Sequence, residues 1–312
     1  MKVFRNAVIL GGTGFIGRHL KQHLENSGIK EIHIADLPDI DVRTSFDVPG
    51  TFGEDTLLVN LAAIHRTPGH PDEDYFKTNI PGAENCCGFA KKNGIKNIVF
   101  MSSISIYGTS ESLKTEETLP MPNTPYGISK LMAERIHREW AAESDGRFLT
   151  ILRPGIVFGK GENGNMTRLY RALKQRRFAY AGRKDTVKAS IYVKDLARIS
   201  LESAQKPKER VQLYNCTYFP APTIEHVAQT MKTATGLNRS IPYIPKIPLM
   251  ATASIAGMLG GFGFGICPER VRKLMVSTNI SGEKLNENYP LKYSLKDAFA
   301  DWFKDCEKRG LE

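Results

Sequence analysis

Three side chains in the middle of the chain have the types and spacing needed to move a proton. Tyr126 and Lys130 stand four residues apart in "TPYGISKLMAE", and Ser103 lies in "FMSSISIYG". Residues four apart share one face of a helix, so we expect the tyrosine and the lysine to point the same way. An ammonium beside a phenol favours the phenolate and lowers its pKa from about 10 toward neutral pH. Such a tyrosine could take a proton from a hydroxyl group or return it, with Ser103 hydrogen-bonded to the same oxygen.

A glycine-rich turn near the N-terminus is suited to binding a pyrophosphate. The stretch "VILGGTGFIGRHL" places Gly11, Gly14 and Gly17 between an apolar run and a helical pattern. Glycines there permit a tight turn and let backbone N–H groups approach a pyrophosphate at a helix N-terminus. The next apolar run ends at Asp36. Its carboxylate could accept hydrogen bonds from both adenosine ribose hydroxyls and would repel a 2′-phosphate, so the pattern favours NAD over NADP.

Short apolar runs alternate with helical patterns through the first half of the chain. We predict strands at residues 6–12, 31–36, 56–63, 97–103 and 148–159, and helices at residues 17–28, 82–94 and 126–144. Strands separated by helices indicate βαβ units, and hence an α/β fold with a doubly wound parallel sheet of the Rossmann type. The pattern loosens after Gly159, where a smaller C-terminal substrate-binding part should begin. We place the NAD-binding domain at residues 1–162 and 184–216, and the substrate-binding part at residues 163–183 and 217–312.

Composition and charge are those of a globular protein with anionic partners. The 312 residues are 41% hydrophobic and 24% charged, and the formal net charge is +10. This balance points to phosphates, nucleic acid or an acidic membrane surface. Eight Lys and Arg against Asp185 alone lie between Arg168 and Lys188, where we expect a basic helix. Five cysteines without a framework spacing suggest reduced thiols and a cytoplasmic protein, and we expect no signal peptide before the first strand.

In this order the motifs resemble the extended short-chain dehydrogenase/reductase family, in its NAD-dependent sugar epimerase/dehydratase group. The resemblance covers essentially the whole chain, through "GGTGFIG", "DVR", "VNLAA", "KTNIPGAEN", "SSISIYG", "YGISK", "LRPGIVFG", "SIYVKDLA" and "YNCTYFPAPTIEHVAQ". It implies NAD as cofactor and Ser103, Tyr126 and Lys130 as catalytic residues. The cofactor residues that it implies are Gly11, Gly14, Phe15, Ile16, Gly17, Asp36, Asp41, Val42, Leu61, Ala62, Ala63, His65, Asn79, Tyr126, Lys130 and Pro154. His65 stands where many relatives have a lysine that reaches the nicotinamide ribose, so a plain loop histidine is the alternative.

The residues after the catalytic serine separate the reactions of this family. Dehydratases typically carry an Asp-Glu pair there, whereas this chain has Ile104 and Ser105, which cannot help to expel water. An epimerase oxidises C4 of the sugar to a ketone and returns the hydride to the other face, which requires only the catalytic trio and tightly held NAD. We therefore expect a 4-epimerase first, a 4-ketosugar reductase of the same fold second, and a non-catalytic dinucleotide-binding regulator last.

The carrier of the sugar is predicted by resemblance alone. Nucleotide-sugar enzymes usually have an arginine where this chain has Lys188, which loses the fork geometry of a guanidinium. Bacterial 4-epimerases acting on N-acetylglucosamine attached to undecaprenyl diphosphate also carry a lysine there, and they act in surface polysaccharide and O-antigen biosynthesis. The substrate contacts that the resemblance implies are Ser103, Ser105, Asn165, Lys188 and Arg270. We expect a hexose or N-acetylhexosamine linked to a nucleotide or polyprenyl diphosphate, a homodimer, no metal and no nucleic-acid partner.

A long uncharged stretch near the C-terminus allows three interpretations. Between Lys246 and Glu269 only Cys267 is ionisable, and the stretch is long enough to span a bilayer, although its five glycines make it weakly apolar. We favour a buried or substrate-covering helix from Pro248 to about Leu259, followed by a glycine loop. In the third interpretation this helix and the basic stretch make a peripheral contact with the inner face of an anionic membrane that holds a lipid-linked substrate.

Overall fold

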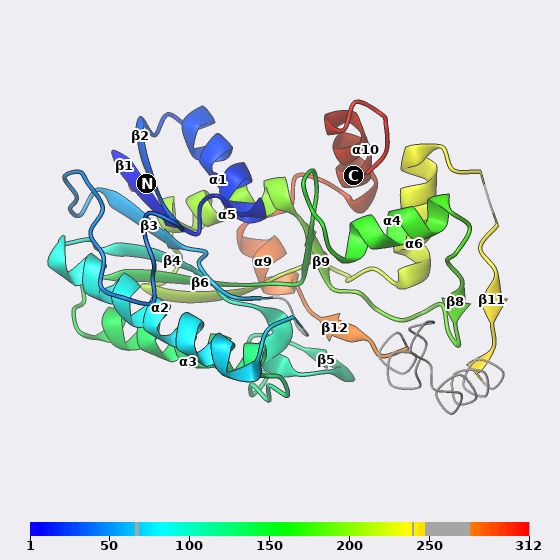
Figure 1. The fold of residues 1–312 in the computed structure, drawn as a ribbon, viewed down its shortest axis with the longest axis horizontal. Helices are drawn as coiled ribbons and strands as arrows, with labels where there is room; N and C mark the ends of the chain where they lie inside the picture. The colour runs from blue at the N-terminus through cyan, green and yellow to red at the C-terminus, as the bar shows by residue number, and fades with distance from the viewer. Residues whose placement is uncertain (66–68, 239, 247–274, 312) are drawn as a thin grey trace.

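The computed structural model describes residues 1–65, 69–238, 240–246 and 275–311, and a parallel sheet forms its centre (Figure 1). The six strands of this sheet lie in the spatial order β10-β6-β4-β3-β1-β2. They are β1 (Asn6–Leu10), β2 (Glu31–Ala35), β3 (Thr56–Asn60), β4 (Asn97–Met101), β6 (Phe148–Pro154) and β10 (Val211–Cys216). The strand order reverses between β1 and β3, the place where parallel sheets of this kind bind dinucleotides. The predicted doubly wound sheet is confirmed.

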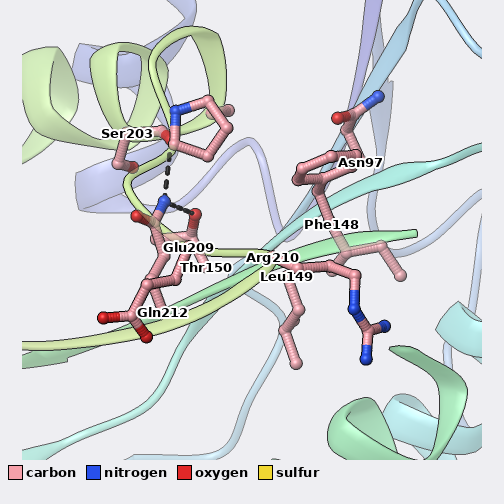
Figure 2. Close-up of a pocket in the computed structure, with 11 residues that line it drawn as sticks. Asn97, Phe148, Leu149, Thr150, Ser203, Glu209, Arg210 and Gln212 are labelled. Atoms are coloured by element: carbon pink, nitrogen blue, oxygen red, sulfur yellow. Dashed lines mark hydrogen bonds between the residues drawn. The ribbon is translucent and has the colours of Figure 1, made fainter. Parts of the chain in front are cut away.

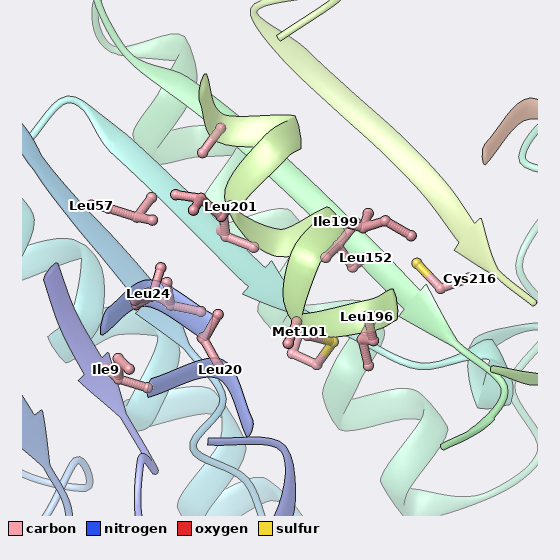
Figure 3. Packing of buried hydrophobic residues seen from close by; sticks show 14 of the residues in the cluster. Ile9, Leu20, Leu24, Leu57, Met101, Leu152, Leu196, Ile199, Leu201 and Cys216 are labelled. Carbon is pink, nitrogen blue, oxygen red and sulfur yellow. The ribbon is translucent and has the colours of Figure 1, made fainter. Parts of the chain in front are cut away.

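Helices cover both faces of the sheet, which is why its central strands are continuous apolar runs. Every residue of β1, β3 and β4 is buried. On one face lie α1 (Phe15–Asn26) and α5 (Val193–Gln205), and on the other α2 (Asp72–Lys92) and α3 (Pro125–Ala142). In Figure 3 the side chains that pack α1 and α5 onto the sheet include Leu20, Leu24, Leu196, Ile199 and Leu201.

Two elements differ from their predicted extents. The predicted 82–94 helix begins earlier, at Asp72, and acidic residues occupy its first turn, where they complement the helix dipole. The predicted 148–159 strand divides at Gly155 into β6 and β7 (Ile156–Phe158). A Cβ on Gly155 would lie 2.5 Å from the carbonyl oxygen of Ala189, so only glycine allows the chain to leave the main sheet here. Strand β7 then pairs with β9 (Ser190–Tyr192).

The basic stretch does not form one helix. Only its first part is helical, in α4 (Asn165–Lys174), and the remainder runs through the short strand β8 (Tyr180–Ala181) toward β9. Strand β8 pairs with β11 (Tyr243–Ile244), and the basic residues are distributed over α4 and the two loops on either side of β8. The expectation of a basic helix between Arg168 and Lys188 was therefore wrong beyond Lys174.

The C-terminal part has a core of its own beside the sheet. Helices α4, α6 (Ile224–Thr235) and α10 (Leu295–Asp305) surround buried residues that include Tyr170, Val227 and Trp302. The helix α9 (Glu283–Asn288) instead packs against β10, and its Leu285 belongs to the core of the main sheet. The domain boundaries remain a prediction, and the contacts of α9 favour adding residues 283–289 to the NAD-binding domain.

The uncharged stretch and Arg270 lie outside the described residues, as does the helix predicted from Pro248 to Leu259. Among the residues that the structure describes, no helix is long and apolar enough to cross a membrane. The chain reaches and leaves this stretch through β11 and through β12 (Thr278–Ile280). Strand β12 pairs with β5 (Ser110–Lys114), which lies between Ser103 and Tyr126 in sequence.

The amino ends of the strands carry a set of polar groups that bind one another. Gln212 Nε2 donates to Thr150 Oγ1 at 2.7 Å and to the carbonyl oxygen of Ser203 at 2.8 Å, tying the end of α5 to the sheet (Figure 2). The depression that these residues line with Asn97 and Phe148 is too small to admit a water molecule. The polar groups here therefore hold the fold together, and this depression has no room for a ligand.

Candidate active site

The glycine turn lies at the carboxyl end of β1, where the strand order reverses. Gly11 has φ +74°, and a Cβ there would lie 2.9 Å from the Cα of Ala62, so both its conformation and its neighbour require glycine. A Cβ on Gly17 would strike the carbonyl oxygen of Gly12. Helix α1 begins after Gly14, and no side chain caps its first N–H groups. These free donors and the missing Cβ atoms fit the pyrophosphate of NAD.

Asp36 follows β2 beside the glycine turn, as the sequence predicted. Its Oδ2 accepts the backbone N–H of Thr13 at 3.0 Å and the hydroxyl of Thr13 at 2.5 Å, and its Oδ1 accepts the N–H of Leu37 at 2.9 Å. The carboxylate is thereby held over the turn at the edge where the adenosine ribose of NAD would lie. Sequence analysis missed Thr13, although its place inside the glycine motif was a usable signal.

The other predicted cofactor residues occupy varied surroundings. Asp41 binds the guanidinium of Arg43, with 2.6 Å between Oδ2 and Nη2, and this hydrogen bonding lowers the pKa of the carboxyl group. Val42 is buried and packs against Gly82 of α2. His65 is exposed in the loop after β3. Partly buried positions are held by Phe15, Ile16, Leu61, Ala62 and Ala63, and Pro154 is buried at the end of β6.

Ser103 and Tyr126 come together at the carboxyl edge of the sheet. Ser103 follows β4 and caps the short helix η1 (Ile104–Tyr107), accepting the N–H of Ser105 at 3.1 Å and donating to its hydroxyl at 3.0 Å. Tyr126 lies in the first turn of α3, which Thr124 caps. Ser103 lies near enough to the Tyr126 phenol for its side chain to act on the pKa of that group. The two side chains therefore lie together, as expected, and the predicted substrate contact Ser105 belongs to the same cluster.

The protonation of Tyr126 and Lys130 differs from the expectation. Burial raises the pKa of Tyr126 to about 12, although the side chain of Ser103 opposes the rise. Burial also lowers the pKa of Lys130 to about 7, and the Lys130 Nζ lies 4.6 Å from the ring centroid of Phe100. The expected lowering of the tyrosine pKa was wrong, because desolvation of the phenol is the largest influence on it and raises its pKa. A cationic cofactor ring beside the phenol would act in the opposite direction.

Asn79 connects the loop after β3 to the catalytic helix. Its side chain accepts the N–H of Ile64 at 2.9 Å and donates to the hydroxyl of Ser129 at 2.9 Å. Ser129 in turn donates to the carbonyl oxygen of Tyr126 at 2.9 Å. The ring of Tyr75, one turn earlier on α2, lies 6.2 Å from that of Tyr126. Helix α2 thus positions the turn that carries the reactive tyrosine.

A buried ion pair that the sequence analysis missed lies behind the trio. Arg153 donates to both carboxylate oxygens of Glu134, at 2.8 and 2.6 Å. Glu134 also accepts the hydroxyl of Ser102 at 2.5 Å, and Arg153 donates to that of Tyr107 at 2.7 Å. Glu134 stands one turn after Lys130 and Ser102 directly before Ser103, so the pair fixes the backbones of both catalytic segments. The only sign of this ion pair in the sequence is Glu134, a charged residue on the apolar face of the predicted helix.

Each of the other predicted substrate contacts that the structure describes has a partner within the protein. Asn165 is exposed at the start of α4, where its Oδ1 accepts Arg168 Nη2 at 2.9 Å. Lys188 Nζ donates to the carbonyl oxygen of Val276 at 3.0 Å, and burial lowers the pKa of its ammonium group. Arg270 cannot be placed, because it lies outside the described residues. In the part of the chain that the structure describes, no group of acids, histidines and cysteines could hold a metal.

A Rossmann-type sheet with a glycine turn at its switch point and a Ser-Tyr-Lys set at its carboxyl edge defines a dinucleotide-binding enzyme of the extended short-chain dehydrogenase/reductase type. Residues 7–217 match the model of the NAD dependent epimerase/dehydratase family. The match covers more than half of the chain, and the protein belongs to this family.

Two similar proteins are epimerases. The chain is 28% identical to the N-acetyl-α-D-glucosaminyl-diphospho-ditrans,octacis-undecaprenol 4-epimerase of Escherichia coli O157:H7, covering 91% of this chain and 89% of that one. It is 29% identical to the UDP-glucose 4-epimerase of Bacillus subtilis, over 51% of this chain and 55% of the other. The first similarity therefore extends through the C-terminal part, and the second is limited to about half of each protein.

Solved structures share the fold. MoeE5 in complex with UDP-glucose and NAD superposes with a TM-score of 0.73 at 21% identity, covering 97% of this chain and 99% of that one. The UDP-N-acetylglucosamine 4-epimerase of Bacillus cereus gives a TM-score of 0.71 at 22% identity, covering 98% and 99%. At these identities the likeness concerns the fold.

Proposed function

We propose that the protein is an NAD-dependent 4-epimerase of a diphosphate-linked hexose or N-acetylhexosamine. The observation that carries the proposal is the Tyr126 phenol beside Ser103, one helical turn from the buried Lys130. Bound NAD supplies a hydride acceptor that can also return the hydride to the same carbon. The 4-ketone of the sugar would be the intermediate, and its two faces would receive the hydride.

The residues of this chain would handle the proton. Ser103 and Tyr126 would bind the C4 oxygen of the sugar, and Tyr126 would take its proton during oxidation and return it during reduction. Lys130 would hold the ribose of the cofactor through its amino group. Asp36 would bind the adenosine ribose, and the N-terminus of α1 the pyrophosphate.

For the carrier of the sugar we favour polyprenyl diphosphate. The support is the similarity to the undecaprenol-linked 4-epimerase, which extends over 91% of this chain, against about half for the UDP-glucose 4-epimerase. With this carrier, the protein would act in the synthesis of surface polysaccharide.

We also propose a peripheral contact with an anionic membrane, where a polyprenyl-linked substrate would be held. The support is a group of exposed basic residues on or just after α4: Arg168, Arg171, Lys174, Arg176 and Arg177. We expect the protein to sediment with anionic vesicles at low salt and to remain in the supernatant at high salt. No association with the vesicles at low salt would contradict the proposed membrane contact.

We also propose a homodimer through α2 and α3. Ile128 and Met132 lie four residues apart on α3 and are 38% and 42% exposed, which suits a face covered by a second copy. Light scattering that gives a monomer mass at micromolar concentration would contradict this proposal.

A 4-ketosugar reductase is the second candidate, because it would use the same trio. The two reactions differ in redox balance, since a reductase consumes a reduced cofactor with each turnover and an epimerase shows no net redox. A non-catalytic regulator has only the net charge of +10 in its favour. The intact proton-transfer trio argues against it.

The test is to offer NAD-loaded protein UDP-N-acetylglucosamine, UDP-glucose and polyprenyl-diphospho-N-acetylglucosamine in separate reactions. The C4 configuration is followed by NMR, and NADH absorbance is followed in parallel. We expect inversion at C4 of the polyprenyl-linked sugar without net change in NADH. Conversion of the UDP-sugars alone would contradict the polyprenyl carrier, and stoichiometric loss of added NADH with a 4-ketosugar would favour the reductase.

A further inference from the structure

A charged cluster lies where β5, β12 and the loop between β8 and β9 meet, outside the catalytic trio. Arg183 Nη1 lies 3.0 Å from Glu111 Oε2, and its Nε and Nη2 donate to the two carboxylate oxygens of Asp185 at 2.7 and 2.9 Å. Glu111 also accepts the backbone N–H of Ser277, at 2.9 Å. All three nitrogens of this guanidinium therefore face carboxylate oxygens.

The contacts of Arg183 have the geometry by which an arginine holds a phosphate. A guanidinium binds a carboxylate or a phosphate through two parallel N–H···O bonds, and Asp185 receives such a pair here. Asp185 stands only two residues away on the same loop, and its side chain is 72% exposed. Exposed ion pairs contribute little to stability. A ligand with two phosphate charges can therefore displace this carboxylate at small cost.

Lys188, the residue that the sequence singled out for this role, is less available. Its Nζ donates to the carbonyl oxygen of Val276, and its side chain is partly buried. A lysine also lacks the two parallel donors of Arg183. Lys188 adds positive charge near the cluster, since both Glu111 and Arg183 act on it electrostatically.

The cluster lies between the catalytic edge and the two ends of the uncharged stretch. Ala189, next to Lys188, packs in one buried group with Ile106 of the short helix that follows Ser103. On the other side, a Cβ on Gly182 would lie 3.4 Å from both Lys246 Cβ and Met275 Cγ. Lys246 and Met275 thus lie beside the residue that precedes Arg183, and they follow β11 and precede β12, whose pairs with β8 and β5 are visible in Figure 1.

We propose that Arg183 binds the diphosphate of the substrate, and that Asp185 takes the place of a phosphate when no substrate is bound. The inference rests on the proposed function, which requires a diphosphate-linked sugar. The sugar would extend from Arg183 toward Ser103 and Tyr126, and the carrier would extend toward Lys246. A nucleotide and a polyprenol share the diphosphate, so Arg183 serves either carrier.

Binding of inorganic pyrophosphate to the NAD-saturated protein tests the proposal by calorimetry. Saturation with NAD fills the glycine turn, so that pyrophosphate reports on the other site. Arg183→Gln is expected to weaken pyrophosphate binding about tenfold or more, and Arg183→Lys to weaken it less. Asp185→Asn is expected to tighten it several-fold, because the competing carboxylate is gone.

The matched control is Arg309→Gln, which removes the same charge from an exposed arginine paired with Glu307, two residues away in the chain. This variant should bind pyrophosphate as the wild type does. Equal losses of pyrophosphate affinity in Arg309→Gln and Arg183→Gln would mean that only net charge matters, and would overturn the proposal. Unchanged binding in Arg183→Gln, or weaker binding in Asp185→Asn, would overturn it as well.

UDP and farnesyl diphosphate in place of pyrophosphate distinguish the two carriers. Binding of either one that is lost in Arg183→Gln supports the subsite, and the compound that binds identifies the carrier. If the wild type inverts C4 of a sugar but Arg183→Gln binds the diphosphate compounds as the wild type does, the Arg183 subsite is wrong and the proposed function stands. If binding of these compounds depends on Arg183 but no sugar is inverted at C4, the subsite stands and the proposed function is wrong.

Discussion

At the amino edge of the sheet the Gln212 side chain donates to Thr150 and Ser203, whereas at the carboxyl edge Lys130 lies buried against the ring of Phe100. Both edges bury polar groups. The amide at the amino edge finds hydrogen-bond partners within the protein, but the pKa of Lys130 falls to about 7 and that of Tyr126 rises to about 12. Ionisable groups whose pKa burial shifts in this way are common at functional sites, which favours the carboxyl edge as the site.

The largest expected effect on turnover comes from removing the Tyr126 hydroxyl at the carboxyl edge, with the loss of a hydroxyl at the amino edge as the comparison. Tyr126→Phe is expected to lower the epimerisation rate about 10²–10⁴-fold, because the proton acceptor is gone. Tyr289→Phe removes a hydroxyl that donates to the carbonyl oxygen of Lys206, far from the catalytic trio. Its turnover should stay within about twofold of wild type, and thermal unfolding should show both variants folded. Turnover of Tyr126→Phe near the wild-type rate would make the catalytic assignment wrong.

Much of the carboxyl edge could be predicted because it is encoded in local sequence. The glycine turn lies in one strand–helix connection, Asp36 directly follows a strand, and Tyr126 and Lys130 lie in one helix. The structure brings Ser103 to Tyr126 as expected. The Glu134–Arg153 pair joins a helix to a strand, and such a contact depends on tertiary packing that no local pattern specifies. The same reason explains the misjudged basic stretch, where strand pairing with β11 replaces the helix after α4. Burial, which decides both shifted pKa values, is also a property of the assembled fold.

The second prediction concerns the cofactor side of the carboxyl edge. Asp36→Asn is expected to raise the Kd for NAD about 10–100-fold, because a charge-assisted pair of hydrogen bonds to the ribose is weakened. It should also reduce the preference for NAD over NADP. Asp39→Asn, in the exposed turn that follows, is the control and should bind NAD as the wild type does. Equal affinity of the Asp36 variant and the wild type for NAD, by fluorescence titration, would exclude the ribose contact.

The third prediction follows from the pKa of Lys130. Between pH 7 and 10 the unfolded chain holds this proton and the folded protein does not, so the free energy of unfolding should rise with pH through this range. Lys130→Met should stabilise the NAD-free protein at pH 7, on the order of 1–3 kcal/mol, and by progressively less toward pH 10. Urea unfolding at several pH values measures the difference. A stability gap that does not change with pH, or one shared by the exposed control Lys30→Met, would refute the shifted pKa.

The smallest effect on activity is expected at the amino edge. Gln212→Leu leaves Thr150 and the carbonyl oxygen of Ser203 without their donor and should lower the free energy of unfolding by about 1–3 kcal/mol. Its kcat and KM should remain those of the wild type at a temperature where the variant is folded. A selective loss of kcat would mean that the amino edge takes part in positioning the site, and the contrast between the two edges would fail.

The measurement that tests the central claim most directly is the fate of deuterium at C4 of the substrate. The wild-type protein is loaded with NAD and given the polyprenyl-linked sugar deuterated at C4, and the product is read by NMR. If Tyr126 handles the proton and the hydride returns to the carbon it left, the inverted sugar keeps its deuterium at C4. Inversion with loss of that deuterium to solvent, or no inversion in any of the three sugars offered, would contradict the account.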